Sequence, residues 1–386
     1  MNIKAFIKKY TMTIALVVVF VMFSFLTQGR LLKDQNISNL LLQNSYVLIM
    51  ACGMLLCILT GGNVDLSVGS TLCLIAAIAS QLMSKFHLPA LAVIVIGLGI
   101  SAAIGIYQGF MIGYVHIPPF ICTLGGMFLF RGLARAILAS KTVAIQNETY
   151  FNIFASYITV PGIDKDGNHV SALIVGLIIV VIMFLMMFRR RKSNIRKGYK
   201  NASLVNELIK TLIIAAIIIL YTNKLRRYKG IPVMLIWLFA VIAIFTFVTS
   251  NTAFGRYFYA VGGNEKATKL SGIDPRRVYF FAYMLMSILA GLAGLIHAAR
   301  IGAVDGNMGN AFEMDAIGSC FIGGASAYGG SGTVPGIMVG AIFLGVINMG
   351  MSILGMSDQW QYVVKGIVLL IAVTFDVISN HKTGKS

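Results

Sequence analysis

Charged residues are scarce in this sequence, and acidic ones most of all. Only 11% of its 386 residues are charged, and 13 Asp and Glu stand against 31 Lys and Arg. Soluble domains carry roughly 25% charged residues, so this composition excludes an ordinary soluble protein. Hydrophobic residues make up 58% of the chain, which indicates an integral membrane protein. The net charge of +18 does not indicate nucleic-acid binding, because most basic residues sit in short connections, as they do in cytoplasmic loops.

Signatures of catalysis and of nucleotide or metal binding are missing as well. No GxxxxGK[ST] phosphate loop occurs, so we do not expect this chain to bind ATP in that way. Neither paired His or Cys ligands nor a nucleophile elbow is present. The cysteines are odd in number, and their spacing matches neither a disulfide framework nor a metal site. We therefore expect no catalytic residue, no metal and no cofactor bound by this chain. The cysteines all lie in apolar segments: Cys52, Cys57, Cys73, Cys122 and Cys320.

Long apolar segments fill most of the chain. A helical span needs about 20 apolar residues, and the sequence supplies about ten to twelve such segments. Backbone groups in lipid must bond within their own segment, which favours helices. The first apolar run follows Lys4, Lys8 and Lys9 and lacks a small-residue cleavage site, so we interpret it as a retained span. We predict an all-α polytopic membrane protein that forms one transmembrane domain over residues 1–386.

The distribution of basic residues predicts the topology. Seven positive charges fall within residues 189–200 and place that loop in the cytoplasm, as an anchor at the lipid surface. Counting spans from there puts both termini in the cytoplasm and residues 141–169 outside. Residues 189–250 then form a basic loop plus an extra helical hairpin. Its basic tip, Lys224–Lys229, falls outside, against the charge rule; the alternative is that Leu208–Tyr221 does not cross.

Two parts of the chain, 45–140 and 278–380, resemble each other weakly. In the first, small residues recur every four positions, which leaves one helix face bare for a close neighbour. The second holds a similarly glycine-rich span, and our topology runs the two copies in opposite directions. Inverted repeats are typical of transporters, whose pathway lies between the halves. The small residues of the first part are Gly97, Ser101, Gly105, Gly109 and Gly113.

Polar residues interrupt the apolar segments at two main places. The stretch GGNVDLSVGS (61–70) carries Asp65, and residues 311–333 carry Glu313 and Asp315. A carboxylate at membrane depth should face protein or a water-filled cavity. The first stretch is either a broken helix that lines a solute path or an N-cap near the inner surface. Uncharged polar residues in other spans either contact solute or join helices to each other. The predicted path residues are Asp65, Ser67, Gln108, Thr123, Glu313, Asp315, Asn348 and Trp360.

One polar stretch, 251–277, separates two long apolar segments. It is too charged for lipid, yet it keeps apolar residues and a short predicted helix, Asn264–Leu270, between glycines. Such a loop either docks onto a partner or packs on the chain's own helices. We interpret it as a cytoplasmic coupling loop that docks onto an ATP-hydrolysing partner.

Five motifs, in order, resemble the bacterial carbohydrate-uptake ABC permeases of the ribose, xylose and galactose types. They are GGNVDLSVGS, IPPFICTLGGMFLFRGL, GRYFYAVGGNEKATKLSGI, EMDAIGSCFIGGASAYGGSGT and WQYVVKGIVLLIAV. The extra hairpin is similar to the xylose and multiple-monosaccharide subgroup. The resemblance implies a coupling helix within Gly255–Ile273. The coupling residues that it implies are Gly255, Arg256, Tyr259, Gly262, Gly263, Asn264, Glu265, Ala267, Leu270, Ser271 and Gly272.

The resemblance also implies a set of partners in the bacterial cytoplasmic membrane. A second permease copy would form a homodimer, surrounded by membrane lipid. ATP-binding subunits would hold ATP and Mg on the cytoplasmic side, and a sugar-binding protein would deliver a monosaccharide from outside. Alternating access would follow closure of the ATPases. The alternatives are a nucleoside permease of the same family and an ion-coupled secondary transporter, which would need charged residues in mid-span.

Overall fold

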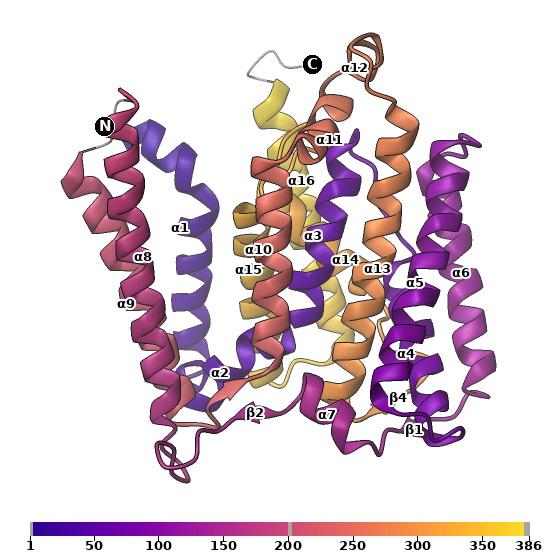
Figure 1. The fold of residues 1–386 in the computed structure, drawn as a ribbon, viewed down its shortest axis with the longest axis horizontal. Coiled ribbons are helices and arrows are strands. Elements are labelled where there is room, and N and C mark those ends of the chain that lie inside the picture. The colour runs from indigo at the N-terminus through magenta and orange to yellow at the C-terminus, as the bar shows by residue number, and fades with distance from the viewer. Residues whose placement is uncertain (1–2, 200–202, 382–386) are drawn as a thin grey trace. The chain divides into compact units, whose positions relative to one another are not determined.

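The computed structural model describes residues 3–199 and 203–381, and nearly all of its elements are helices (Figure 1). The strands in these ranges are two residues long each. Eight helical segments are long and apolar enough to cross a membrane, and two further apolar ones, Thr11–Leu26 and Val68–Ser84, are shorter. The prediction of an all-α polytopic membrane protein is confirmed.

The chain divides into two compact units. Unit 1 comprises the described residues up to Leu31, residues 40–155 and the residues from Met234 onward. Its helices are α1 (Ile3–Leu26), α3 (Ser45–Leu59), α4 (Val68–Ser84), α5 (Ala90–Gly113), α6 (Pro119–Ile137), α7 (Glu148–Phe154), α10 (Met234–Asn251), α11 (Ala253–Gly263), α12 (Glu265–Leu270), α13 (Pro275–Ile301), α14 (Phe312–Ile322), α15 (Val334–Ile353) and α16 (Asp358–His381).

The centre of unit 1 is formed by α3 and α13. Every residue of α3 is buried. The helix is apolar on all sides, as expected for a helix that other helices enclose. The small residues of α5 lie against α13. A methyl group on Gly109 would stand 2.5 Å from the carbonyl oxygen of Phe280, and one on Gly113 would stand 2.5 Å from that of Arg276. The predicted close approach of a neighbouring backbone is therefore confirmed.

Two features of unit 1 interrupt the regular helices. An extended stretch separates α3 from α4, and α14 has only 11 residues, which is about 16 Å at 1.5 Å per residue and too short to cross a membrane alone. At the end that carries α7, β1 (Val143–Ala144) pairs antiparallel with β4 (Ala303–Val304). The inverted repeat of 45–140 and 278–380 stays a prediction.

Unit 2 comprises residues 32–39 and 156–233, and its main elements are α8 (Val170–Arg196) and α9 (Leu204–Arg226). The helix α2 (Asp34–Gln43) begins in it. Strand β2 (Tyr157–Ile158) pairs with β3 (Ile231–Pro232), which brings the hairpin tip beside the stretch predicted to lie outside. At the tip, Lys224 forms an ion pair of 2.7 Å with Asp34. Since α9 is itself long and apolar enough to cross a membrane, the structure favours a crossing hairpin.

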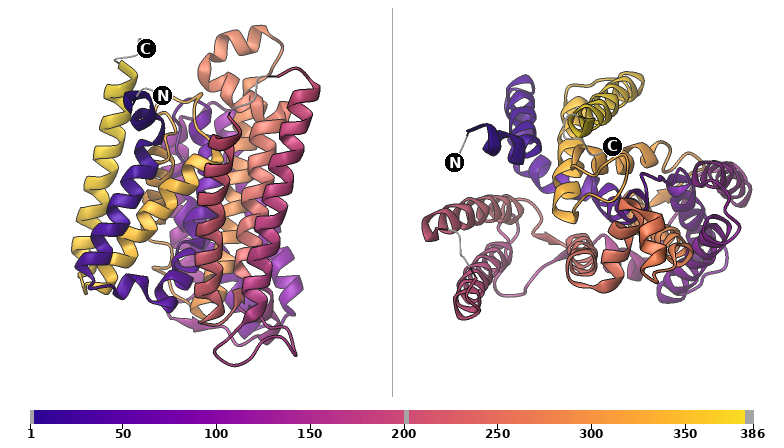
Figure 2. Two further views of the ribbon diagram at one scale, coloured as in Figure 1. Left: turned by 90° about the vertical axis from the view of Figure 1, so that its left-hand side faces the viewer. Right: turned by 90° about the horizontal axis from the view of Figure 1, so that it is seen from above.

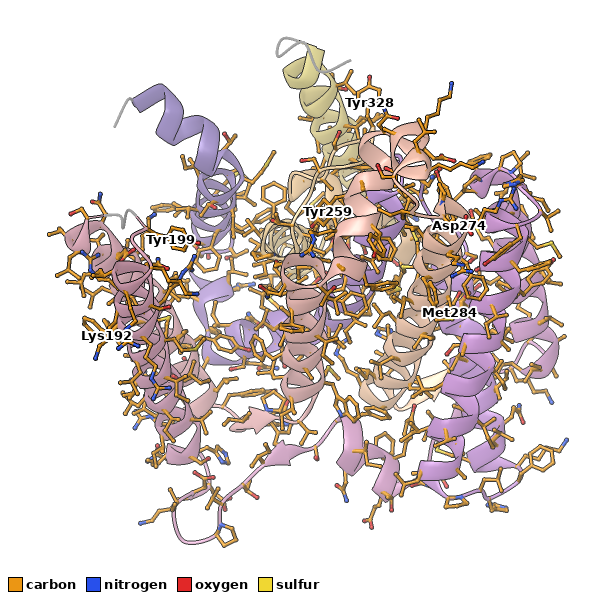
Figure 3. All side chains as sticks on the ribbon, turned by 45° about the horizontal axis from the view of Figure 1, so that its top comes forward. Lys192, Tyr199, Tyr259, Asp274, Met284 and Tyr328 are labelled. Carbon is orange, nitrogen blue, oxygen red and sulfur yellow. The ribbon has the colours of Figure 1, made fainter. Side chains whose placement is uncertain are left out.

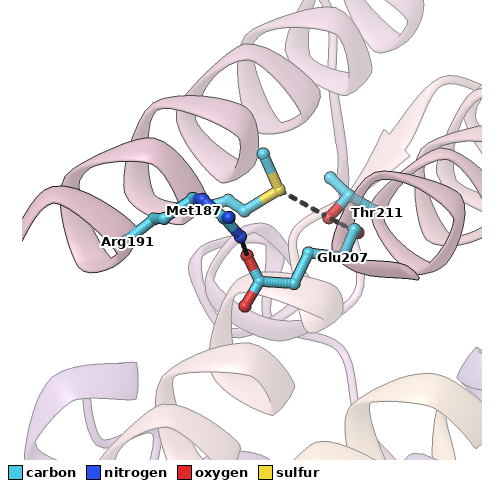
Figure 4. A network of polar contacts seen from close by, with 4 residues as sticks. All are labelled: Met187, Arg191, Glu207 and Thr211. Carbon is cyan, nitrogen blue, oxygen red and sulfur yellow. Dashed lines mark hydrogen bonds and ion pairs between the residues drawn. The ribbon is translucent and has the colours of Figure 1, made fainter. Parts of the chain in front are cut away.

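The other end of the hairpin is joined by polar contacts between α8 and α9 (Figure 4). Arg191 and Glu207 form an ion pair of 3.0 Å, and the Thr211 hydroxyl lies 3.2 Å from the sulfur of Met187. One positive charge of the basic run is thereby neutralised. Arg189, Arg190, Lys192 and Arg196 remain exposed around it.

We expect Glu207→Gln to lower the stability only slightly. The ion pair is partly exposed to solvent, so its loss should cost about 0.5 kcal/mol or less. Thermal unfolding of the purified chain in detergent would measure the change. The difference from the wild type should shrink at high salt, because salt screens exposed charges. A loss above about 2 kcal/mol would show that the pair holds the hairpin together.

Candidate functional site

The predicted coupling loop, residues 251–277, forms two short helices, each with a side-chain cap at its start; we call it the coupling segment below. In α11, the Thr252 hydroxyl accepts a hydrogen bond of 3.0 Å from the backbone N–H of Gly255. In α12, Asn264 Oδ1 accepts one of 2.9 Å from Ala267. Such caps satisfy backbone donors that a helix start leaves free. The predicted helix Asn264–Leu270 is confirmed, with Asn264 as its N-cap.

The apolar residues of this segment divide into an inner and an outer set. Phe258 and Val261 of α11 are buried in unit 1. Leu270 at the end of α12 is 90% exposed, which is unusual for a leucine. The left view of Figure 2 shows α11 and α12 projecting at one end of the unit. The structure shows that part of this apolar set packs on the chain's own helices, whereas Leu270 is exposed; docking onto a partner stays a prediction.

The base of the coupling segment meets two other glycine-rich turns, backbone against backbone. We call this meeting point the glycine junction; its central residues are Gly62, Gly262 and Gly330. The N–H of Gly330 donates a hydrogen bond of 3.0 Å to the carbonyl of Leu59. A methyl group on Gly262 would overlap that same carbonyl oxygen, and one on Gly62 would overlap the carbonyl oxygen of Ala327. The coupling segment is thus wedged between the two turns that follow α3 and α14.

Tyrosine hydroxyl groups strengthen this connection. Tyr259 donates a hydrogen bond of 3.0 Å to the carbonyl of Gly332, and Tyr279 donates one of 3.0 Å to Oε2 of Glu265. Burial raises the pKa of Tyr259, so this hydroxyl stays protonated and remains a donor. Figure 3 shows Tyr259, Asp274 and Tyr328 at this end of unit 1. The bond from Tyr259 joins α11 to the turn after α14, and the bond from Tyr279 joins α12 to α13.

A polar groove of about 240 Å³ lies beside α12. Glu265, Arg276 and Tyr279 line it from the coupling segment and the start of α13. Asn63 and His116 line it from the turns after α3 and α5. The exposed helix and the groove together form a continuous surface on which a protein partner could dock.

The first predicted path residues meet in a buried network. Asp65 Oδ1 accepts hydrogen bonds of 2.8 Å from the N–H and 2.7 Å from the hydroxyl of Ser67. Gln108 Nε2 donates one of 2.8 Å to the Ser67 hydroxyl, and Ser287 donates one of 3.3 Å to Gln108 Oε1. Asp65 therefore supports the start of α4. Ser67 is the N-cap residue of α4, but its side chain makes no capping bond.

Asp65→Asn and Asp65→Ala should separate the two roles that the sequence left open. The asparagine keeps Oδ1 as an acceptor and removes a buried charge, so its unfolding temperature should stay near that of the wild type. Alanine loses both bonds, at about 1 kcal/mol each, and should unfold at a lower temperature. Thermal unfolding and solute uptake are measured on both. If the asparagine variant is stable yet inactive, the charge itself serves transport.

Three further predicted path residues lie at three separate places. Glu313 is buried, and its Oε2 lies close to the backbone of Gly69 at the start of α4. Asp315 accepts hydrogen bonds at Oδ2 from Tyr46 and Lys365. Thr123 is buried and donates to the carbonyl of Pro119 within its own helix. The structure thus brings Glu313 toward the first network but gives Asp315 other partners.

Two path candidates stand apart from these groups. Trp360 is 62% exposed on α16, and Asn348 on α15 is half-buried. The sequence also left Lys365 unassigned, although a charge inside the apolar run WQYVVKGIVLLIAV is itself a signal of a functional site. Tyr46 and Ser287 carried no such signal. Among the described residues, no group of three or more His, Cys, Asp or Glu is placed to hold a metal ion.

Two arginines of α6 hold the turn before α14. Arg131 donates to the carbonyl of Met308, and Arg135 donates a hydrogen bond of 3.0 Å to Oδ1 of Asn307. Arg131 therefore satisfies a backbone carbonyl of this irregular turn, and Arg135 holds one of its side chains. This arrangement joins α6, in the first predicted repeat, to the turn between α13 and α14, in the second.

Comparison with known proteins supplies the decisive observation about the class of this chain. Residues 36–373 match the family model described as the branched-chain amino acid transport system permease component. The chain belongs to this permease family. Its members are transport components, and with its apolar helices the chain is a multi-pass membrane protein. No solved structure matches the chain significantly.

Characterised members of the permease family are similar to this chain over nearly its full length. The xylose transport system permease protein XylH of Haemophilus influenzae is 34% identical over 375 residues, 97% of each chain. The ribose import permease protein RbsC of Escherichia coli is 31% identical over 97% of this chain and 95% of its own. The galactose/methyl galactoside import permease protein MglC of E. coli is 29% identical, over 88% and 86%. These matches confirm the resemblance to sugar ABC permeases.

Proposed function

We propose that this chain is the membrane subunit of an ATP-driven importer that moves a monosaccharide into the cell, as a homodimer. The observation that carries the proposal is the exposed helix α12 with Leu270 at its end. It follows directly on the glycine junction, where Gly262 at the end of α11 is wedged between two turns of the transmembrane core. An exposed, capped helix with an outward leucine is suited to enter a cleft of another protein. Cytoplasmic ATPase subunits would be that protein.

The arrangement of unit 1 supports the proposed orientation. Figure 1 shows the start of α1 and the end of α16 at the same end of the unit as α12. If α12 docks on a cytoplasmic ATPase, both ends of the described chain lie on the cytoplasmic side. The opposite end, with α7 and the β1–β4 pair, then faces outward, where a sugar-binding protein would deliver the solute.

The names of the relatives guide the choice of substrate. The relatives are named as permeases for xylose, ribose and galactose, which are neutral monosaccharides. We therefore propose that this chain transports a sugar of the same class. Because the highest identity among these three belongs to a xylose permease, xylose is the first solute to test. The buried carboxylate of Asp315 is paired with Lys365, which leaves fewer free charges for the ion relay of a secondary transporter.

Reconstitution tests the proposal directly. The tagged chain is expressed with the ATP-binding and sugar-binding subunits of a sugar importer from the same organism, purified and placed in proteoliposomes. We expect the subunits to purify together and labelled xylose to accumulate only with ATP and the binding protein. ATP-driven uptake of a nucleoside but of no sugar would replace the substrate class. Transport by the isolated chain, driven by an ion gradient, would overturn the proposal.

A further inference from the structure

A buried cluster around Asp315 joins three helices of unit 1. Asp315 on α14 is 1% exposed, and its Oδ2 lies 3.0 Å from both the Tyr46 hydroxyl of α3 and the Lys365 ammonium of α16. The Tyr46 ring stacks on Phe312, with 3.7 Å between the ring centroids. His297 packs edge-on against both rings. The tyrosine is therefore held firmly, and with it one side of the carboxylate.

A cavity of about 100 Å³ opens beside this ion pair, between α14, α15 and α16. Its polar lining comes from Asp315, Tyr362 and Lys365, and most of the rest is apolar, including Leu344 and Leu369. A water needs about 10–15 Å³ of such space, so the cavity has room for several waters or for one edge of a small polar ligand. Apolar walls with few converging polar groups are typical of ligand sites.

The ion pair offers unused hydrogen-bonding capacity to this cavity. An ammonium group has three donors. Among the described residues, that of Lys365 donates to Asp315 alone, which leaves two N–H bonds without a protein acceptor. The bonds from Tyr46 and Lys365 both reach Oδ2, so neither of them occupies Oδ1 of Asp315. A strong donor and a strong acceptor thus stand side by side at the cavity.

The charge of the pair determines which ligand fits. The two charges of the pair cancel. An anion in the cavity would be repelled by Asp315 at close range, and a cation would be repelled by Lys365. A hydroxyl group both donates and accepts, and two neighbouring hydroxyls can therefore satisfy both partners at once. The apolar walls and the half-exposed Tyr362 ring suit the C–H face of such a molecule. The geometry favours a neutral polyol.

We propose that this cavity is a solute subsite, in which Lys365 donates to one sugar hydroxyl and Asp315 accepts from its neighbour. The inference rests on the proposed function and names its site. Lys365, to which no role was assigned above, becomes a binding residue, and Asp315 changes from a general path residue to a specific binding residue. Tyr362 lines the edge of the subsite without bonding to the solute. A purely structural role is weak for such a pair, because buried ion pairs stabilise proteins little more than well-packed apolar residues do.

Protection of a cysteine tests the subsite without ATP. Tyr362→Cys is made in the full chain, which is placed in lipid nanodiscs and labelled with a water-soluble maleimide. The wild type gives the background from its native cysteines, four of which are buried. We expect xylose to slow the labelling of the introduced cysteine about threefold or more. Betaine at equal osmolality is the control and should leave the labelling rate unchanged. Equal labelling rates with and without xylose, ribose and galactose would overturn the subsite.

Narrowing the cavity gives a second readout that leaves the ion pair intact. A methyl group on Gly318 would stand 3.2 Å from Cδ1 of Leu344, a tight contact that requires this flexible side chain to shift slightly, and 3.7 Å from Cδ1 of Leu369, an ordinary contact. Gly318→Ala is added to the Tyr362→Cys variant. It should raise the concentration needed for half-protection about tenfold more for galactose, which is larger, than for xylose. Gly99→Ala is the control, because its methyl group would meet nothing within 4 Å. If the ratio of galactose protection to xylose protection is the same in the Gly318→Ala variant as in the Gly99→Ala control, the proposal is contradicted.

The charge variant separates this inference from the proposed function. Lys365→Met should abolish protection by every sugar. ATP-driven uptake by the wild-type complex is measured in parallel. Uptake without any protection refutes the subsite and leaves the proposed function standing. Protection without ATP-driven uptake supports the subsite and refutes the ATP-driven mechanism.

Discussion

Gly262→Ala should abolish sugar uptake. The added methyl group would overlap the carbonyl oxygen of Leu59 and stand 2.6 Å from the backbone nitrogen of Gly330. Both are backbone atoms, so no side chain can rotate away, and the glycine junction must open. Overpacking of this kind costs about 3 kcal/mol, and the strain falls where we propose that motion passes from α12 to the two turns. Uptake by a deletion strain that carries the variant measures the effect.

Two control variants make this result interpretable. Gly263→Ala changes the neighbouring residue, whose methyl group would meet nothing within 4 Å, and it should unfold at the wild-type temperature. Gly125→Ala in α6 is equally open and should leave uptake unchanged. The amount of each variant in the membrane is checked by immunoblot. Normal uptake by Gly262→Ala would mean that the junction can open freely and transmits nothing.

Ala267→Pro should also reduce uptake to background while the chain stays in the membrane. Proline removes the N–H that Asn264 Oδ1 accepts, and it pushes Lys266 out of the helical region of backbone angles. The helix α12 has only six residues, so the loss of its first turn removes most of it. We expect an uptake loss of about 100-fold, equivalent to about 3 kcal/mol of lost coupling.

The matched control for this variant is Ala267→Ser, which keeps the N–H and should transport normally. Glu265→Lys tests the same surface by charge, because it breaks the hydrogen bond from Tyr279 and reverses the charge presented to a partner. Co-purification with the ATPase subunits shows at which step each variant fails. If Ala267→Pro still assembles and transports at the wild-type rate, α12 is not the coupling element.

Local patterns were sufficient for the elements of the candidate site. The glycines on either side of Asn264–Leu270 predict a short helix, and small residues every four positions in α5 predict a close neighbour, because both signals lie within one stretch of chain. The partner of that glycine face, α13, is about 180 residues away in the sequence, and no local pattern names it. The same limit applies to Asp315, whose neighbours Tyr46 and Lys365 lie on two distant helices.

The sequence alone determined that this chain is a helical membrane protein, because scarce charge and long apolar runs leave helices as the way to satisfy the backbone in lipid. It also determined the family, through motifs that remain recognisable in order. Only the tertiary structure decided that Leu270 points outward while Phe258 and Val261 are buried, and that three glycine-rich turns touch. These outcomes depend on contacts between segments far apart in the chain, and such contacts form only when the helices pack.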